Sequence, residues 1–192
     1  IGEQQPENAG AAESVSGTAR SDGTERANGQ KRRITGSAHR ELTVACARDL
    51  LKLAEELDYD YLLTAEAKSI PLIHEMARQS GAEKYFLARK GPKAYMSGVF
   101  EVHVKSITTM DVQRLVIDTA DAELIKGKRI LIVDDVISTG ESLRAMEELV
   151  TRAGGSIVGR MAVLAEGAAQ KRDDIIVLGD LPLFNPDGTV KA

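Results

Sequence analysis

The sequence predicts an α/β protein in which a mostly parallel sheet is flanked by helices on both faces. From Arg40 onward, segments with apolar residues at helical spacing alternate with short apolar runs. The clearest run, residues 129–133, contains four consecutive apolar residues, as expected of a strand that is buried on both faces. Strands that alternate with helices form parallel sheets with right-handed crossovers, and ligands bind at the carboxyl ends of such strands.

The segment at residues 1–38 differs in composition from the rest of the chain. It consists mainly of Gly, Ser, Glu, Gln, Asn, Thr and Ala, and its large apolar residues are Ile1, Val15 and Ile34. Such a segment cannot bury enough apolar surface to offset the entropy lost on ordering it. We therefore predict a disordered, low-complexity tail over residues 1–38 and a folded domain over residues 39–192.

The first half of the domain opens with a predicted amphipathic helix over residues 42–57. Cys46 lies on its apolar stripe, so we expect a core residue rather than a nucleophile. Pro71 in the first turn and Gly81 after the last turn are typical of the bounds of a second helix. The elements predicted after the first helix are a strand at residues 61–63, a helix at residues 70–79 and a strand at residues 85–88.

The second half contains a predicted pair of strands, residues 99–104 and 114–117, which are joined by a polar turn. A helix is predicted over residues 143–153, because Gly154 and Gly155 follow its apolar pattern. The other strands predicted in this half span residues 129–133, 157–164 and 175–178, and a helix is expected to start at residues 172–174.

Composition and charge exclude several classes of protein. The chain has 25 Lys and Arg against 29 Asp and Glu, and the resulting net charge of −4 gives no reason to expect nucleic-acid binding. The single cysteine cannot form an internal disulfide or a cysteine-rich zinc site. No run approaches the roughly 18 apolar residues that span a bilayer, and residues 1–10 lack the pattern of a signal peptide. We expect a cytoplasmic protein that binds neither nucleic acid nor membrane.

The most informative segment is residues 130–142. Its apolar strand is followed by Asp134 and Asp135, and then by a short loop that leads into a helix. Backbone N–H groups at a helix start bind phosphate, and Gly140 lets the anion approach closely. The carboxylates need other partners, such as sugar hydroxyls or a hydrated Mg²⁺. The segment therefore predicts a site for a phosphorylated sugar bound with a metal. Three hydroxyl side chains can add donors: Ser138, Thr139 and Ser142.

This segment resembles the phosphoribosyl-diphosphate (PRPP) signature of the type I phosphoribosyltransferases. The resemblance implies that Asp134 and Asp135 are catalytic residues that bracket the ribose hydroxyls. It also implies that Mg²⁺ arrives with PRPP rather than on protein ligands, and that the enzyme is a homodimer. The implied fold carries a flexible antiparallel loop and a small hood over the base. The residues expected to cradle the 5′-phosphate are Ser138, Thr139, Gly140, Glu141 and Ser142.

Two other segments extend the resemblance. Residues 63–68 place small and polar side chains between a strand and a helix, and are similar to the diphosphate-binding loop of the family. Residues 89–93 carry three cations and resemble the Arg-Lys-x-x-Lys stretch of adenine phosphoribosyltransferases, although solvated surface charge is an equal alternative. Residues 172–174 look like the C-terminal part of xanthine phosphoribosyltransferases. The implied diphosphate-binding residues are Ala65, Glu66, Ala67, Lys68, Arg89, Lys90 and Lys93.

The flexible loop departs from the adenine-type pattern. Adenine enzymes carry a Ser-Leu-Glu-Tyr-Gly-like stretch whose Glu helps to handle a proton. Aligning Ser106 with that Ser puts Thr108 at the Glu position, and Thr is no comparable acid or base. Lys105 and the expected hairpin still allow the loop to close over substrate. His103 is the nearby histidine, and a structural role is favoured over a proton role.

The part that would recognise the base is also atypical. The hood of this family is often built by N-terminal residues, which here form the tail at residues 1–38. The hood is therefore shortened, missing, or replaced by residues 181–185. Phe184 can stack on a purine, an interaction worth about 1–3 kcal/mol per base, or it can pack on the core.

The closest resemblance is to a purine phosphoribosyltransferase, with adenine as the favoured base. The enzyme would transfer the phosphoribosyl group of PRPP to the base and release diphosphate. The alternative is a regulatory domain that binds PRPP without chemistry, which Thr108 favours and the retained cations oppose. A third interpretation is a copy without a hood, which binds PRPP but transfers nothing.

Overall fold

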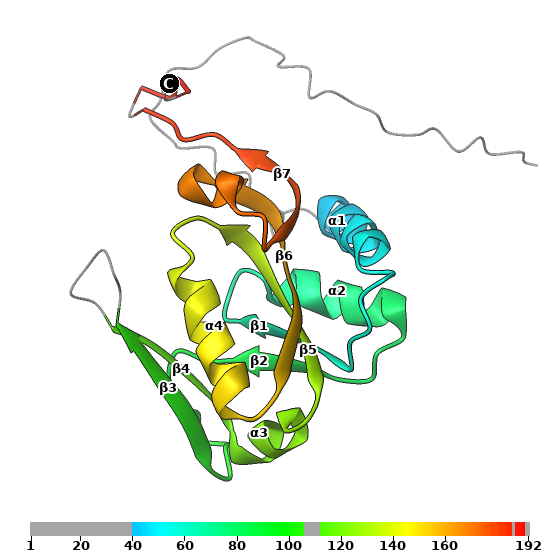
Figure 1. Ribbon diagram of the computed structural model, residues 1–192, viewed down its shortest axis with the longest axis vertical. Helices are drawn as coiled ribbons and strands as arrows, with labels where there is room; N and C mark the ends of the chain where they lie inside the picture. The colour runs from blue at the N-terminus through cyan, green and yellow to red at the C-terminus, as the bar shows by residue number, and fades with distance from the viewer. Residues whose placement is uncertain (1–39, 106–111, 186, 191–192) are drawn as a thin grey trace, which may run out of the picture. The chain divides into compact units, whose positions relative to one another are not determined.

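The computed structural model describes residues 40–105, 112–185 and 187–190 (Figure 1). The predicted tail and the loop positions Ser106 and Thr108 lie outside these ranges. Within them, no helix is both long and apolar enough to cross a membrane. The elements are α1 (Arg40–Leu53), β1 (Tyr61–Ala65), α2 (Ile70–Ser80), β2 (Tyr85–Ala88), β3 (Val99–Lys105), β4 (Val112–Asp118), α3 (Thr119–Ile125), β5 (Arg129–Ile137), α4 (Glu141–Arg152), β6 (Ser156–Glu166), the 3₁₀ helix η1 (Gly167–Lys171) and β7 (Ile176–Leu181).

The main sheet has five strands in the order β2-β1-β5-β6-β7, and every neighbouring pair is parallel. A separate antiparallel sheet is formed by β3 and β4. Helices cover both faces of the main sheet, with α1 and α2 on one side and α4 on the other (Figure 1). The prediction of a mostly parallel sheet flanked by helices, with an antiparallel pair beside it, is confirmed.

Strand β5 lies at the centre of the sheet, and its side chains alternate between two cores. Ile130 and Ile132 pack in the core beneath α3 and α4, whereas Leu131 and Val133 pack in the core beneath α1 and α2. All four side chains are fully buried. A strand that is covered on both faces requires a continuous apolar run, so the prediction of a buried strand here is confirmed.

Strand β5 extends beyond the predicted end at residue 133. Its pairing with β6 continues to Ile137, which lies opposite Ala165. Asp134 and Asp135 therefore belong to the last part of the strand and do not follow it. The sequence alone misplaced this end because β6, which supplies the hydrogen bonds, is itself longer than predicted.

Two other predictions required correction, and one helix was missed. The first helix ends at Leu53 and not at residue 57, because a turn brings Leu57 back onto the core, where its N–H donates to the Ala54 carbonyl at 2.9 Å. Residues 172–174 do not start a helix, since Arg172 has an extended backbone after η1. The short helix α3 was missed, although Asp118 caps it by accepting from the Ala120 N–H at 3.0 Å. By contrast, Cys46 is buried in the core, as predicted.

The antiparallel pair is attached to the main sheet through Arg89, directly after β2. Arg89 and Val116 of β4 exchange two backbone hydrogen bonds, at 2.8 and 2.7 Å. Val102 and Leu115 bury the inner face of the pair in the same core as α4. The pair is therefore joined to the main sheet directly after the end of β2.

The amino ends of β1 and β5 are joined by Asp60 and Arg129. The Asp60 N–H donates to the Arg129 carbonyl at 2.8 Å, and the Asp60 carboxylate accepts from the Arg129 N–H at 2.8 Å and from Nη2 at 3.0 Å. The Arg129 guanidinium also contacts Asp58. These hydrogen bonds lower the pKa of Asp60 to about 2. The arrangement fixes the register of the two strands that carry the site.

Replacing Asp60 with Asn should lower the melting temperature at neutral pH by a few degrees. Because the pKa of Asp60 is lower in the folded protein than in the unfolded chain, its carboxylate stabilises the fold above about pH 4. That stabilisation is lost as the pH falls through about 2. Thermal unfolding from pH 7 to pH 2 should therefore show the gap between wild type and variant closing.

The control is Glu148→Gln, which removes the carboxylate of an exposed i,i+4 pair with Arg152 on α4. Exposed pairs of this kind contribute little to stability, so this variant should match wild type throughout. A gap for Asp60→Asn that stays constant down to pH 2 would contradict the prediction.

Candidate functional site

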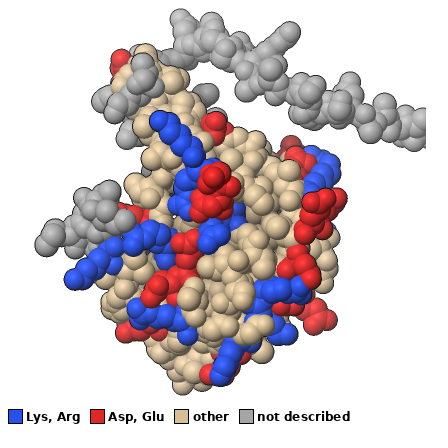
Figure 2. Space-filling model, viewed as in Figure 1, with Lys and Arg blue, Asp and Glu red and all other residues tan. Residues whose placement is uncertain are grey.

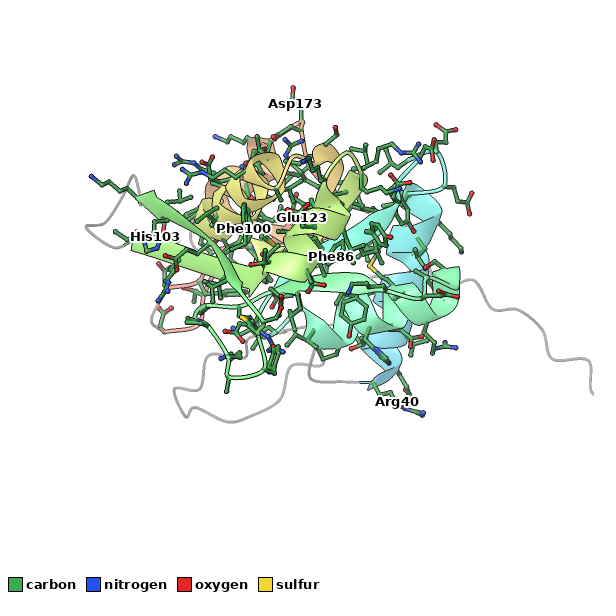
Figure 3. The ribbon with its side chains drawn as sticks, turned by 90° about the horizontal axis from the view of Figure 1, so that it is seen from below. Arg40, Phe86, Phe100, His103, Glu123 and Asp173 are labelled. Atoms are coloured by element: carbon green, nitrogen blue, oxygen red, sulfur yellow. The ribbon has the colours of Figure 1, made fainter. Side chains whose placement is uncertain are left out.

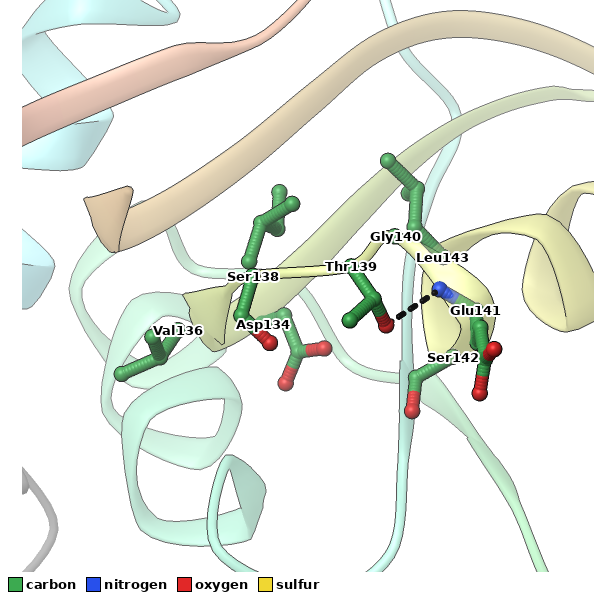
Figure 4. A pocket seen from close by; sticks show the side chains of 9 residues that line it. Asp134, Val136, Ser138, Thr139, Gly140, Glu141, Ser142 and Leu143 are labelled. Atoms are coloured by element: carbon green, nitrogen blue, oxygen red, sulfur yellow. Dashed lines mark hydrogen bonds between the residues drawn. The ribbon is translucent and has the colours of Figure 1, made fainter. Parts of the chain in front are cut away.

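The carboxyl end of β5 and the start of α4 enclose a pocket (Figure 4). The structure brings together Asp134 and the whole predicted phosphate loop at this point. Asp135 lies beside the pocket and is half-buried. The pocket is lined by Asp134, Val136, Ile137, Ser138, Thr139, Gly140, Glu141, Ser142 and Leu143.

Gly140 shapes the turn that leads into α4. Its φ of +77° lies in the left-handed region, which glycine adopts without the strain of a Cβ atom. Helix α4 starts at Glu141, earlier than the predicted start at residue 143, and its first-turn N–H groups face the loop. The Thr139 hydroxyl accepts from the Glu141 N–H at 3.5 Å, shown dashed in Figure 4. A helix start of this kind can bind an anion.

Arg172 brings positive charge to the same turn. A Cβ atom built on Gly140 would lie 2.9 Å from the Arg172 Nη1 atom, so the guanidinium packs closely against the loop. Its Nε and Nη2 atoms donate to Asp174 at 2.8 and 2.6 Å, which leaves Nη1 on the side of the loop. Arg172 was predicted at a helix start, and its place at this turn was missed. No local signal identifies it, since α4, β6 and η1 separate it from Gly140 in the chain.

Asp134 is held by two hydrogen bonds to one oxygen. Its Oδ1 accepts from the Ser69 hydroxyl at 2.6 Å and from the Asp135 N–H at 2.9 Å. Burial raises the pKa of Asp134 well above the ordinary range, and the neighbouring charge of Asp135 raises it further. The hydrogen bond from Ser69 acts in the opposite direction. Ser69 is a second residue that sequence reasoning missed, although it directly follows the predicted diphosphate loop.

The loop after β1 and the cations after β2 meet at Glu66. The Glu66 carboxylate accepts from the Lys90 N–H at 2.6 Å and from Arg89 Nη1 at 3.1 Å, and Lys93 Nζ lies 3.9 Å away. Although burial by itself raises the pKa of Glu66, these donors bring it below its ordinary value. The Glu66 N–H is used by the Ala88 carbonyl at 2.9 Å. Glu66 therefore holds the cations in place.

The remaining residues of this loop differ in exposure. Ala65 ends β1 and is buried, whereas Ala67 and Lys68 are exposed at the turn before α2. Lys90 and Lys93 are exposed as well, and Arg89 is half-buried. Positive and negative side chains are interspersed on the face shown in Figure 2. Attraction for an anion on that face therefore depends on individual groups and not on a patch of one sign.

The other predicted site residues that the structure describes do not line this pocket. Lys105 is exposed at the end of β3, and Ser106 and Thr108 fall outside the described residues. His103 lies on the same strand, where its Nε2 is 3.3 Å from Glu101 Oε1 (Figure 3). Phe184 is 48% exposed and forms an isolated backbone bridge with Val190. It is thus accessible for contact with a ligand.

The turn at Gly140 lies at the carboxyl end of the central strand of a parallel α/β sheet, which is the edge where such sheets bind their ligands. The chain matches the family model of the phosphoribosyl transferase domain over residues 39–181 and belongs to that family. The resemblance noted in the sequence is confirmed at this level.

Relatives within the family carry different base specificities in their names. The adenine phosphoribosyltransferase of Rubrobacter xylanophilus is 31% identical over 130 residues, which is 66% of this chain and 65% of that protein. The hypoxanthine/guanine phosphoribosyltransferase of Methanosarcina acetivorans is 33% identical over 122 residues, covering 64% of this chain and 60% of that protein. The chain thus spans slightly less than two thirds of the length of these two relatives.

The fold is also that of a solved adenine phosphoribosyltransferase. The crystal structure of the enzyme from Thermoanaerobacter pseudethanolicus matches 73% of this chain and 81% of its own, with a TM-score of 0.61 and 20% sequence identity. At this identity the match concerns the fold.

Replacing Gly140 with Ala should weaken binding of ribose 5-phosphate by about tenfold. A left-handed conformation costs an Ala residue about 1–2 kcal/mol, and the new Cβ would also displace Arg172 from the turn. Isothermal calorimetry gives the affinity and scanning calorimetry gives the stability.

The matched control is Gly81→Ala at the end of α2. Gly81 has a φ of +75°, and a Cβ atom there would meet nothing within 4 Å. Both variants should lose similar stability, whereas the affinity should fall for Gly140→Ala alone. Equal affinities for the two variants would show that the turn does not bind the phosphate.

Proposed function

We propose that the protein is a PRPP-dependent purine phosphoribosyltransferase. The observation that carries this proposal is the pocket that joins the Asp134 carboxylate to the helix-start loop at residues 138–142. A phosphate fits the loop, and sugar hydroxyls fit the carboxylate, so the pocket suits a ribose phosphate. Membership of the phosphoribosyl transferase domain family supports the same substrate.

In the proposed reaction, a purine nitrogen forms a bond to the anomeric carbon of the ribose. The bond from that carbon to diphosphate breaks, and its electron pair leaves with diphosphate. The purine loses one ring N–H proton, which passes to water or to the released diphosphate. Positive charge develops on the ring in the transition state, close to Asp134 and Asp135, whose carboxylates stabilise it when they are ionised. No covalent nucleophile is required. The cations that would stabilise the leaving diphosphate are Lys68, Arg89, Lys90 and Lys93.

Mg²⁺ fits this site as an ion that is bound mainly by the substrate. Among the described residues, no three His, Cys, Asp or Glu side chains are grouped so that they could hold a metal by themselves. Mg²⁺ commonly takes most of its ligands from substrate phosphates and water, so the oxygens of PRPP would hold it here. The ion, when bound, neutralises charge on the leaving diphosphate. The protein residues position the two ends of PRPP.

We favour adenine as the base because residues 89–93 have the Arg-Lys-x-x-Lys pattern and because one relative is named an adenine phosphoribosyltransferase. The hypoxanthine/guanine relative is of similar identity, so other purines are natural competitors. Phe184 is the candidate to stack on the base, because nearly half of its side chain is exposed. We also propose that the enzyme works as a cytoplasmic homodimer.

Diphosphate release from PRPP and Mg²⁺ should depend on the base that is added. Adenine, hypoxanthine, guanine and xanthine are tested separately with a coupled diphosphate assay, and adenine should give the fastest release. Release with a different base alone would support the transferase activity and identify that base as the substrate. No release with any base, together with calorimetric binding of PRPP, would overturn the enzyme and favour the non-catalytic PRPP-binding domain.

Replacing Asp134 with Ala should weaken PRPP binding by about 10–100-fold. A hydrogen bond to a charged group contributes about 1.5–3 kcal/mol, and each 1.4 kcal/mol corresponds to about tenfold in affinity. Calorimetric titration of PRPP with Mg²⁺ measures the loss. Glu148→Gln, on the exposed side of α4, serves as the unchanged control. Unaltered affinity in Asp134→Ala would refute its role at the ribose.

A further inference from the structure

Ser69 occupies a position where a serine hydroxyl normally caps a helix. It is the N-cap residue of α2 and is only 1% exposed. A serine at this position usually accepts a hydrogen bond from an N–H group in the first turn. The Ser69 side chain makes no such bond. Its hydroxyl points instead across the sheet edge to the end of β5, a strand from the second half of the domain.

The Ser69 hydroxyl forms hydrogen bonds with both carboxylate residues of β5. It donates to Asp134 Oδ1 at 2.6 Å and accepts from the Asp135 N–H at 3.0 Å. Its distance to Asp135 Oδ1 is longer, at 3.3 Å. Because a hydroxyl has one proton, the shorter contact identifies Asp134 as the acceptor. The buried Ser69 hydroxyl thus donates one hydrogen bond to β5 and accepts another from it.

These contacts determine which oxygen of Asp134 can meet a ligand. Oδ1 already accepts from the Ser69 hydroxyl and from the Asp135 N–H at 2.9 Å. Oδ2 is the remaining acceptor, on a residue that lines the phosphate pocket. The Asp135 N–H is shared between this oxygen and the Ser69 oxygen, and together with the Ser69 hydroxyl it fixes the rotation of the carboxylate group. The orientation of Asp134 is therefore set before substrate arrives.

We propose that Ser69 is a positioning residue for phosphoribosyl transfer, which holds Asp134 with one oxygen offered to a ribose hydroxyl. This inference rests on the proposed function. Ser69 belongs to the same turn as residues 65–68, where the diphosphate of PRPP is expected. One hydroxyl thereby ties the turn for the leaving group to the carboxylate for the ribose.

Electrostatics gives this arrangement a second effect. Burial and the charge of Asp135 both favour the protonated form of Asp134, whereas the hydrogen bond from Ser69 favours the anion. Glu141 lines the same pocket from the start of α4, and Lys68 is exposed beside Ser69 on the turn. An anionic carboxylate accepts more strongly from a sugar hydroxyl than a neutral one does. Ser69 thus supports both the direction and the charge of Asp134.

The test compares two ligands on the full chain. Ribose 5-phosphate carries hydroxyls on C2 and C3, whereas 2,3-dideoxyribose 5-phosphate keeps the phosphate and lacks both of these hydroxyls. Ser69→Ala should lower the affinity for ribose 5-phosphate by about tenfold, because the variant lacks the hydrogen bond from Ser69 to the charged Asp134 carboxylate. The same variant should change the affinity for the dideoxy ligand by less than about threefold. Dissociation constants are measured by NMR titration at millimolar ligand concentrations.

Two further variants sharpen the result. Ser69→Thr keeps the hydroxyl and should restore most of the affinity for ribose 5-phosphate. Ser80→Ala removes an exposed serine hydroxyl at the other end of α2 and should leave both affinities unchanged. If the threonine methyl group disturbs the buried position, the comparison of the two ligands on Ser69→Ala still decides.

The outcomes separate this inference from the function on which it rests. If wild type binds ribose 5-phosphate and Ser69→Ala binds it equally well, or loses both ligands to the same extent, the positioning role is wrong and the ribose site stands. If wild type binds neither ribose 5-phosphate nor PRPP, the proposed function falls and the positioning role falls with it.

Discussion

The structure depends on a central strand that is apolar on both faces and ends in two carboxylates. Ile130 to Val133 fill the two cores, so β5 cannot move without disturbing the helices on both sides of the sheet. The strand therefore delivers Asp134 and Asp135 to one defined place. Burying carboxylates is costly unless they are hydrogen-bonded, and Ser69 and the Asp135 N–H supply those bonds. A rigid apolar strand and a small polar network together fix the site.

In each half of the proposed substrate site, a carboxylate of the protein holds the neighbouring cations in place. At the leaving-group side, the Glu66 carboxylate gathers Arg89, Lys93 and the Lys90 N–H. At the phosphate side, Asp174 orients Arg172 against the turn at Gly140. Cations that are held in this way lose less freedom when an anion arrives, so they are organised in advance. Carboxylates that cannot themselves bind phosphate thus serve to place the groups that can.

Local patterns in the sequence predicted the elements that depend on short windows. The buried run of β5, the loop at residues 138–142 and the alternation of strands with helices are all of this kind. The end of β5 could not be predicted, because it depends on pairing with β6. The short helix α3 lacked a long enough apolar period. Ser69 and Arg172 were missed because their partners, at the end of β5 and at the start of α4, belong to distant segments of the chain. Roles for residues 1–38, Ser106 and Thr108 stay predictions.

Arg89 has two structural duties. Its backbone exchanges two hydrogen bonds with Val116 and so fastens the β3–β4 pair to the edge of the main sheet, while its guanidinium reaches Glu66 in the turn after β1. The same residue therefore links the antiparallel pair to the turn after β1. Because the backbone and the guanidinium belong to one residue, a change in how the pair meets the sheet at Val116 would also shift the group that contacts Glu66.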